Sequence, residues 1–468
     1  MLFNSFQFAI FFVALLIVLR VAPWRARVHV LLAASLLFYT LWIPSYLLLL
    51  LGTLGVNYLL VLGMMRSQHP RRYVIVSIAF TLSLLAAFKY AVFAIEAVAP
   101  VLAQLRMGPI PAPDLLLPLG ISFYSFEIIS LTIDIYRRRQ PCPSFARYVL
   151  FVTFFPHLIA GPIMRGYELL PQLAAGGAPD PARTRRGVWL IAAGLVKKAI
   201  FADYFLAPFV NDVFAEPGTA SGPAQLLAVY SFAFQIYFDF AGYTDMARGL
   251  ACMLGFELPH NFLEPYLSRS ASEFWRRWHI SLSRWLRDYL YIPLGGNRGS
   301  AVRTALNLMA TMLLGGLWHG AGWNFVVWGA LHGCLLAVER WFGATRGAET
   351  DQLSWRDVPR ILFTFHAVCL IWVTFRAPTL SAAVTVWTAL FTKTYFVSWP
   401  VLPTVVVLVC AGLHVLERSV HGWLSALQAL VARNAWWGPA IEGAALGAIL
   451  MAAVVMSGAG AEFIYFQF

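Results

Sequence analysis

The sequence predicts an all-α protein, a polytopic integral membrane helix bundle with about 11 to 13 membrane segments, some of them re-entrant. Composition is the first observation behind this prediction. Hydrophobic residues make up 60% of the 468-residue chain and charged residues 12%, whereas a soluble chain carries about 25% charged residues. A soluble protein of this length could not keep so much apolar surface away from water, and a lipid-facing surface removes that difficulty.

The second observation is that arginines cluster between apolar runs. The first five spans are predicted at residues 6–21, 28–43, 46–65, 73–98 and 115–136. Basic clusters follow the first, third and fifth of them, at 20–27, 66–72 and 137–139, so all three fall on one side. Positive clusters mark cytoplasmic loops, which puts the N-terminus outside. The net charge of +12 therefore indicates membrane topology, and we predict no nucleic-acid partner.

The sixth apolar run, residues 148–164, departs from this alternation. Arg147 and Arg165 flank it, and Pro156, Gly161 and Pro162 interrupt it. Broken backbone at membrane depth needs shelter among protein helices, so we predict a re-entrant segment. Further apolar stretches lie at 188–214, 224–256, 306–338, 361–375, 382–391, 401–416 and 441–457. With no linker or soluble region evident, we predict one transmembrane domain over residues 1–468.

Residues 271–298 form the most informative segment, ASEFWRRWHISLSRWLRDYLYIPLGGNR. Its aromatic and leucine residues recur at spacings of three and four, which predicts an amphipathic helix at the cytoplasmic interface. Its basic side chains either anchor the helix by the positive-inside rule or attract an anionic cosubstrate from the cytosol. The candidates for this second role are Arg276, Arg277, Arg284 and Arg287.

Histidines provide the candidate chemistry. His319 lies within an apolar stretch, LLGGLWHGAGWNFVVWGALHG, residues 313–333, whose glycines predict close helix packing. A lone histidine on an apolar helix more often packs against its neighbours than takes part in catalysis. His319 is not alone, because His279 lies 40 residues earlier in a Trp-rich segment, and this favours a catalytic role. An imidazole is suited to accepting a proton from an attacking hydroxyl. No Asp, Glu or Cys follows at ligand spacing, so we predict no metal site and no bound cofactor. His332 has no site-like sequence around it.

A third polar element is QIYFDFAGYTDMAR, residues 235–248. Asp239 and Tyr243 are four residues apart and share a helix face. Intramembrane carboxylates are candidates for function. A polar clasp that holds helices together explains Asp239 equally well, and the sequence leaves both interpretations open.

The segments FWRRWHISLSRWLRDYLYIPLGGNR and LLGGLWHG resemble the membrane-bound O-acyltransferase family. The similarity is greater to its bacterial branch, which includes the membrane subunit of alginate O-acetyltransferase systems. Three further segments, PLGISFYSFEIISLTIDIYR, FPHLIAGPIMR and IYFDFAGYTDMARGL, also resemble that branch, as does the terminal FIYFQF. The resemblance covers nearly the whole chain, in the expected order.

The resemblance implies a helix bundle that encloses a catalytic tunnel in the bacterial inner membrane. It implies transfer of an acetyl group from cytosolic acetyl-CoA to an extracytoplasmic polysaccharide such as an alginate-like exopolysaccharide, with a periplasmic acetyltransferase partner. The histidine of the family's WHG motif, regarded as the catalytic base, maps to His319. His279 maps to a second polar position, and we add Trp278 and Trp318 beside these histidines as substrate-binding residues. Transfer of another acyl group, such as D-alanine from a carrier protein, and non-enzymatic glycan transport are the alternatives.

The C-terminus offers one more candidate. Tyr465 carries the only hydroxyl of the final hexad, FIYFQF. Aromatic residues are common membrane-interface anchors, which is one interpretation. In the other, Tyr465 carries the acyl group as an ester between the thioester and the acceptor, as is proposed for a similar motif in related systems.

Overall fold

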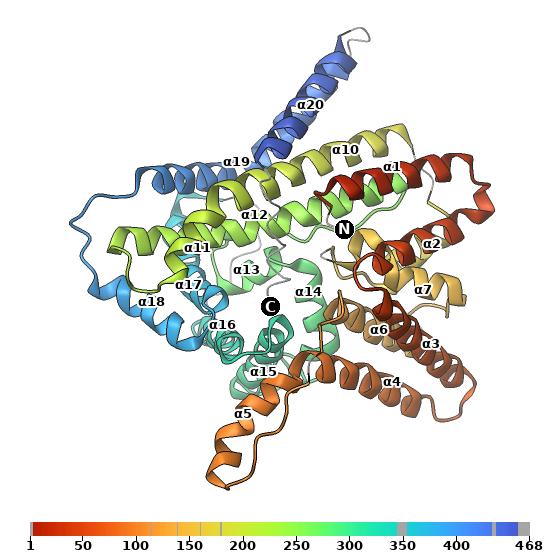
Figure 1. The fold of residues 1–468 in the computed structure, drawn as a ribbon, viewed down its shortest axis with the longest axis horizontal. Helices are drawn as coiled ribbons and strands as arrows, with labels where there is room; N and C mark the ends of the chain where they lie inside the picture. The colour runs from red at the N-terminus through yellow and green to blue at the C-terminus, as the bar shows by residue number, and fades with distance from the viewer. Residues whose placement is uncertain are drawn as a thin grey trace. The chain divides into compact units, whose positions relative to one another are not determined.

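The computed structural model describes residues 3–113, 115–137, 139–159, 161–177, 180–343, 353–432 and 437–456, and side chains of 418–432 are not described. Throughout these ranges helices are the sole regular secondary structure, as predicted (Figure 1). The Cα positions divide the chain into two compact units. Unit 1 comprises residues 1–188 and 247–259, and unit 2 comprises 189–246 and 260–468.

Unit 1 is built mainly from the first ten helices of the chain. It contains α1 Phe6–Val21, α2 Arg27–Thr40, α3 Pro44–Arg66, α4 Pro70–Leu85, α5 Ala91–Gln104, α6 Ile121–Tyr136, α7 Phe145–Thr153, α8 Phe155–Leu158, α9 Gly166–Ala175 and the first part of α10 Pro181–Leu195. A π-helical segment, Ala86–Tyr90, joins α4 to α5. The predicted sixth run is indeed broken, because α7 ends at Thr153 and a single turn, α8, follows Phe154.

Buried polar side chains form hydrogen bonds and an ion pair between the helices of unit 1. The Ser77 hydroxyl of α4 donates to Asn57 Oδ1 of α3 at 2.5 Å. The Glu127 carboxylate of α6 lies 3.1 Å from His157 Nδ1 of α8 and accepts from the Met164 backbone N–H at 3.2 Å. These contacts tie the broken segment to a long helix, which is the shelter that interrupted backbone needs.

Unit 2 holds the rest of the chain. It contains α11 Ala207–Ala215, α12 Gly222–Leu254 up to residue 246, α13 Ala271–Arg277, α14 Ile280–Leu286, α15 Ala301–His319, α16 Trp323–Trp341, α17 Val358–Arg376, α18 Leu380–Thr392, α19 Val401–Ala432 and α20 Gly438–Met456. Its core is aromatic, with Trp278, Trp328 and Trp372 among the most buried side chains. A π-helical segment, Val196–Leu206, lies between α10 and α11 and carries the buried Lys198.

Within the described residues, four helical stretches are long and apolar enough to cross a bilayer. They are Pro44–Arg66, Pro70–Gln104, Trp355–Arg376 and Gly438–Met456. Shorter apolar helices are Phe6–Val21, Leu380–Thr392 and Val401–Glu417. The larger predicted number of 11 to 13 also counted short and interrupted runs, and it remains a prediction. Helices such as α15 and α16 are long enough to span but carry buried polar side chains.

Candidate active site

The two histidines singled out by sequence lie close together in unit 2. His319 is the last residue of α15, and His279 separates α13 from α14. Their ring centroids are 6.4 Å apart, and both side chains are buried. Forty residues of chain separate them, so only the folded unit brings the two imidazoles to one place.

A tight helical hairpin positions His319. Helices α15 and α16 lie side by side, joined by a short turn (Figure 1). Gly316 and Gly329 face each other, and a Cβ on either would collide with a backbone carbonyl of the opposite helix. The predicted role of these glycines in close packing is therefore confirmed. The close approach places Trp328 of α16 against His319, with ring centroids 4.9 Å apart.

Aromatic rings enclose both imidazoles. Trp318 and Phe375 lie 5.0 and 5.3 Å from His319 between ring centroids, and Phe240 of α12 lies 4.7 Å from His279. His279 lies outside the four candidate spans, and burial lowers its pKa to about 3. Its imidazole is therefore neutral near pH 7.

His332 belongs to the same cluster, which sequence reasoning missed. Its ring lies 4.7 Å from Trp328 and 5.1 Å from Trp275, and the side chain is fully buried. Trp328 thus packs against both His319 and His332. No periodicity links the two histidines, because the chain reverses direction between α15 and α16. We therefore expect replacement of His332 to cost packing energy.

The segment around His279 differs from the predicted continuous amphipathic helix. α13 ends at Arg277, and His279 adopts φ 41° and ψ 56° before α14 begins. Left-handed backbone is uncommon for a residue other than glycine and breaks the helix there. The apolar positions are not an interfacial face either, since Phe274, Trp278 and Leu282 are buried in the unit 2 core.

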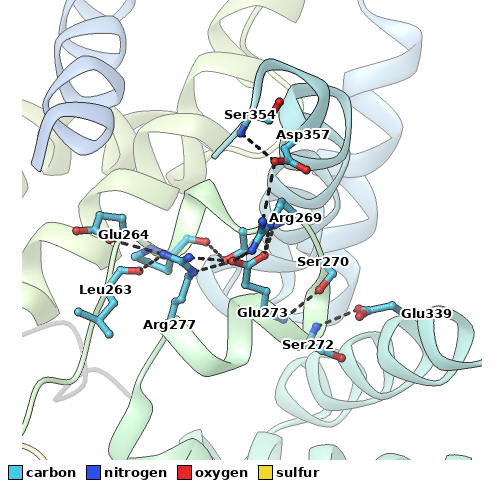
Figure 2. Close-up of polar contacts among 12 residues, drawn as sticks. Leu263, Glu264, Arg269, Ser270, Ser272, Glu273, Arg277, Glu339, Ser354 and Asp357 are labelled. Carbon is cyan, nitrogen blue, oxygen red and sulfur yellow. Dashed lines mark hydrogen bonds and ion pairs between the residues drawn. The ribbon is translucent and has the colours of Figure 1, made fainter. Parts of the chain in front are cut away.

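The four arginines of this segment fall into two groups. Arg276, Arg284 and Arg287 are exposed, and Arg287 pairs with Asp288 at 2.7 Å. Arg277 instead lies 2.8 Å from Glu273 and 3.6 Å from Glu264 (Figure 2). Its charge is therefore already balanced by carboxylates. All three exposed guanidinium groups can be reached from solvent by an anionic ligand, but that of Arg287 already pairs with Asp288.

Arg277 belongs to a wider ion network. Glu273 also binds Arg269 at 2.9 Å, and Arg269 lies 3.9 Å from Asp357 (Figure 2). Burial alone would raise the pKa of the Glu273 carboxyl, but hydrogen bonds and charge from the two arginines hold that pKa below its usual value. The carboxylate is therefore charged at neutral pH and anchors α13.

Asp239 pairs with a lysine, and the next residue, Phe240, lies against His279. The Asp239 carboxylate is 2.6 Å from Lys198 Nζ, which is also 2.8 Å from Asp203. Tyr243 is fully buried on the same helix. This arrangement fits the helix-clasp interpretation of Asp239. Tyr465 lies outside the described residues.

The arrangement suits proton transfer in a water-poor setting. A neutral imidazole can accept a proton from a hydroxyl held against it, and a second imidazole nearby can donate to developing negative charge. In the described part of the chain, no group of three or more His, Cys, Asp or Glu side chains is placed to hold a metal ion.

Comparison with known families defines the class of protein. Residues 117–375 match the model of the membrane-bound O-acyltransferase family. These residues include α13 to α16 and both histidines. The chain belongs to this family and is a multi-pass membrane O-acyltransferase.

Among individual members of the family, the chain is similar to O-acetylating proteins and, at lower identity, to a D-alanyltransferase. The chain is 41% identical to the probable alginate O-acetylase AlgI of Azotobacter vinelandii over 398 residues, 84% of this chain and 78% of the relative. It is 37% identical to the peptidoglycan O-acetyltransferase of Helicobacter pylori over 387 residues, 75% of this chain and 71% of the relative. The teichoic acid D-alanyltransferase of Bacillus subtilis is 27% identical over 278 residues, 55% of this chain and 68% of the relative.

Proposed function

We propose that this protein transfers an acetyl group from cytosolic acetyl-CoA to an extracytoplasmic polysaccharide, an alginate-like exopolysaccharide. The observation that carries the proposal is the buried His279–His319 pair within the family-matched region. The names of the relatives with higher identity support acetyl over other acyl groups and a glycan acceptor. The protein acts in the bacterial inner membrane, with its N-terminus extracytoplasmic.

In this reaction His319 takes the proton of the attacking hydroxyl. The hydroxyl oxygen forms a bond to the thioester carbonyl carbon, the carbon–sulfur bond breaks, and the proton passes to the departing thiolate. His279 orients the thioester or stabilises charge on its carbonyl oxygen. Trp278 and Trp318, which adjoin the two histidines in the chain, are proposed to contact the substrates.

The donor is proposed to enter from the cytosolic side. Arg276, Arg284 and Arg287 are exposed, and three cationic side chains attract the phosphates of coenzyme A. Their exposure supports this role, whereas the balanced charge of Arg277 favours a structural one. A tunnel through the bundle would let donor and acceptor approach from opposite faces of the membrane.

Two further transfer steps are proposed to carry the acetyl group from the histidine site to the polymer. A periplasmic acetyltransferase partner delivers the group to the polymer. Tyr465 carries the acetyl group as an ester between His319 and that partner, which splits one long transfer into two short ones. Tyr465 lies outside the described residues, and this role is proposed from the sequence of the terminal hexad alone.

The decisive experiment measures turnover of radiolabelled acetyl-CoA by purified protein. Wild-type protein is expected to hydrolyse the thioester slowly, and His319→Ala is expected to lose that activity while the protein still expresses and folds. His366→Ala is the matched control, because His366 is exposed on α17. Full activity in His319→Ala would remove this residue from the mechanism.

The same preparation tests the donor. A D-alanyl carrier protein offered in place of acetyl-CoA should give no transfer. Reaction with the carrier protein but not with acetyl-CoA would assign the protein to the D-alanyl class named by the Bacillus subtilis relative. Wild-type protein that turns over neither donor would refute the donor proposal.

A further inference from the structure

The backbone of His279 is held in an unusual conformation by a neighbouring segment. Its φ of 41° lies in the left-handed region, which costs free energy for a residue other than glycine. Such a conformation persists only where the surroundings over-determine it. The contacts that do so come from residues 261–263, which run beside the break between α13 and α14.

Hydrogen bonds from this segment fall on both sides of His279. The Leu263 N–H donates to the Arg277 carbonyl at 3.0 Å, and the Ile280 N–H donates to the Asn261 carbonyl at 2.9 Å. Asn261 Oδ1 accepts twice more from Ser281, from its N–H at 3.1 Å and its hydroxyl at 2.9 Å. Asn261 therefore supplies two acceptor atoms to the two residues that follow His279.

The other side of the break is fixed by charge. The Arg277 guanidinium donates to the Leu263 carbonyl at 3.3 Å and pairs with Glu273 and Glu264 (Figure 2). Arg277 thus joins α13 to the segment that carries Asn261. With both flanks held, the backbone at His279 has little freedom, and its side chain is directed at Phe240 and His319.

We propose that Asn261 is a positioning residue for the acyl-transfer site, because its two acceptor oxygens hold His279 in the left-handed conformation that sets the imidazole beside His319. The proposal rests on the function proposed above, in which His279 acts on the thioester. Asn261 is 1% exposed, so its side-chain acceptor lies out of reach of bulk water. An apolar residue of similar size would remove both hydrogen bonds that Ser281 donates to Oδ1.

The kinetic test replaces Asn261 with alanine. A misplacement of about 1 Å at a catalytic group costs on the order of 100-fold in rate, so kcat for acetyl-CoA turnover is expected to fall by that order with little change in KM. The Asn261→Asp variant keeps the acceptor oxygen but buries a carboxyl group, so it should recover part of the rate. In a His279→Ala background, Asn261→Ala should cause no further loss, because the residue it positions is gone.

A second readout does not depend on activity. Diethylpyrocarbonate modifies accessible imidazoles, and peptide mass spectrometry reports each histidine separately. His279 is fully buried in the wild type and should be modified several-fold faster in Asn261→Ala. His332, equally buried on α16, should stay protected, which shows that the unit remains folded.

Asn57→Ala is the matched control. Asn57 is also fully buried and its Oδ1 also accepts two hydrogen bonds, from Ser77 and Thr81, but it lies in unit 1. Its loss should lower the melting temperature and leave His279 protected. If Asn261→Ala fails to fold, Ser281→Ala removes one of the two bonds to Oδ1 and should give a smaller change of the same kind.

Three results would overturn the proposal. The first is unchanged protection of His279 in the folded Asn261 and Ser281 variants, and the second is a loss of kcat that adds fully to that of His279→Ala. The third is equal exposure of His279 and His332 in every folded variant, which would make Asn261 a residue of general stability. Failure of the proposed donor is distinguishable, because wild-type protein would then lack turnover while His279 modification still responded to Asn261.

Discussion

Lys198 and its two carboxylates allow a sharp test of what Asp239 does. The Lys198 ammonium lies 2.8 Å from Asp203 and 2.6 Å from Asp239, and the three side chains are 1%, 8% and 3% exposed. Lys198→Met keeps the length and apolar stem of the side chain and removes the charge. Two buried carboxylates then lose their shared cation.

The size of the effect follows from that burial. Removing one partner from a buried ion pair costs about 3–5 kcal/mol. At roughly 2–4 °C per kcal/mol for a large domain, the melting temperature should fall by about 6–20 °C. Asp239→Asn leaves Lys198 paired with Asp203, so it removes one charge-assisted hydrogen bond and should cost less, about 1.5–3 kcal/mol.

The assay is thermal unfolding in detergent, followed by activity per folded molecule. The double variant Lys198→Met/Asp239→Asn leaves only the Asp203 carboxylate without its cation, whereas Lys198→Met alone leaves two. The double variant should therefore have the higher melting temperature. Asp239→Asn should keep its KM for acetyl-CoA. A double variant no more stable than Lys198→Met would refute the clasp. A normally stable Asp239→Asn protein with a greatly raised KM would instead establish Asp239 as a substrate-binding residue.

Three further predictions concern the hairpin, the topology and the C-terminus. Gly316→Ala should destabilise the protein by about 1–3 kcal/mol and impair turnover, because the new Cβ meets a backbone carbonyl of α16, whereas Gly315→Ala meets only a leucine side chain at 3.3 Å and should be milder. A cysteine placed in residues 105–113, between α5 and α6, should react with an impermeant maleimide on intact cells, and one beside Arg71 only after permeabilisation; the reverse pattern would invert the orientation. Tyr465→Phe keeps the aromatic ring and removes the hydroxyl, so polymer acetylation should be lost if Tyr465 carries the acetyl group and retained if it is an anchor.

Several features of this protein could be predicted from the sequence because their physical cause is local. Apolar runs and arginine clusters identify a membrane protein, since hydration and charge act on each segment independently of its neighbours. The break in the sixth run follows from Pro156 and Gly161 in the same way. His279 and His319 were found through short motifs that resemble those of a family, not through any periodicity.

Other features depend on contacts between distant parts of the chain. The 6.4 Å separation of the two histidine rings and the inclusion of His332 in their cluster require the α15–α16 hairpin to pack against α13. The pairing of Lys198 with Asp239 joins residues 41 positions apart, and only that pairing favours a clasp over a binding role.

The helix break at His279 is the feature that local sequence patterns predict least well. Spacings of three and four predict one continuous helix there, and helix propensity favours it. Tertiary contacts override that preference, because Asn261 offers acceptors to Ser281 and Arg277 finds carboxylates at Glu273 and Glu264. The sequence alone predicted which residues carry the chemistry. Only the tertiary structure decided how they meet, because hydrogen bonds and ion pairs between distant segments outweigh the local cost of a left-handed histidine.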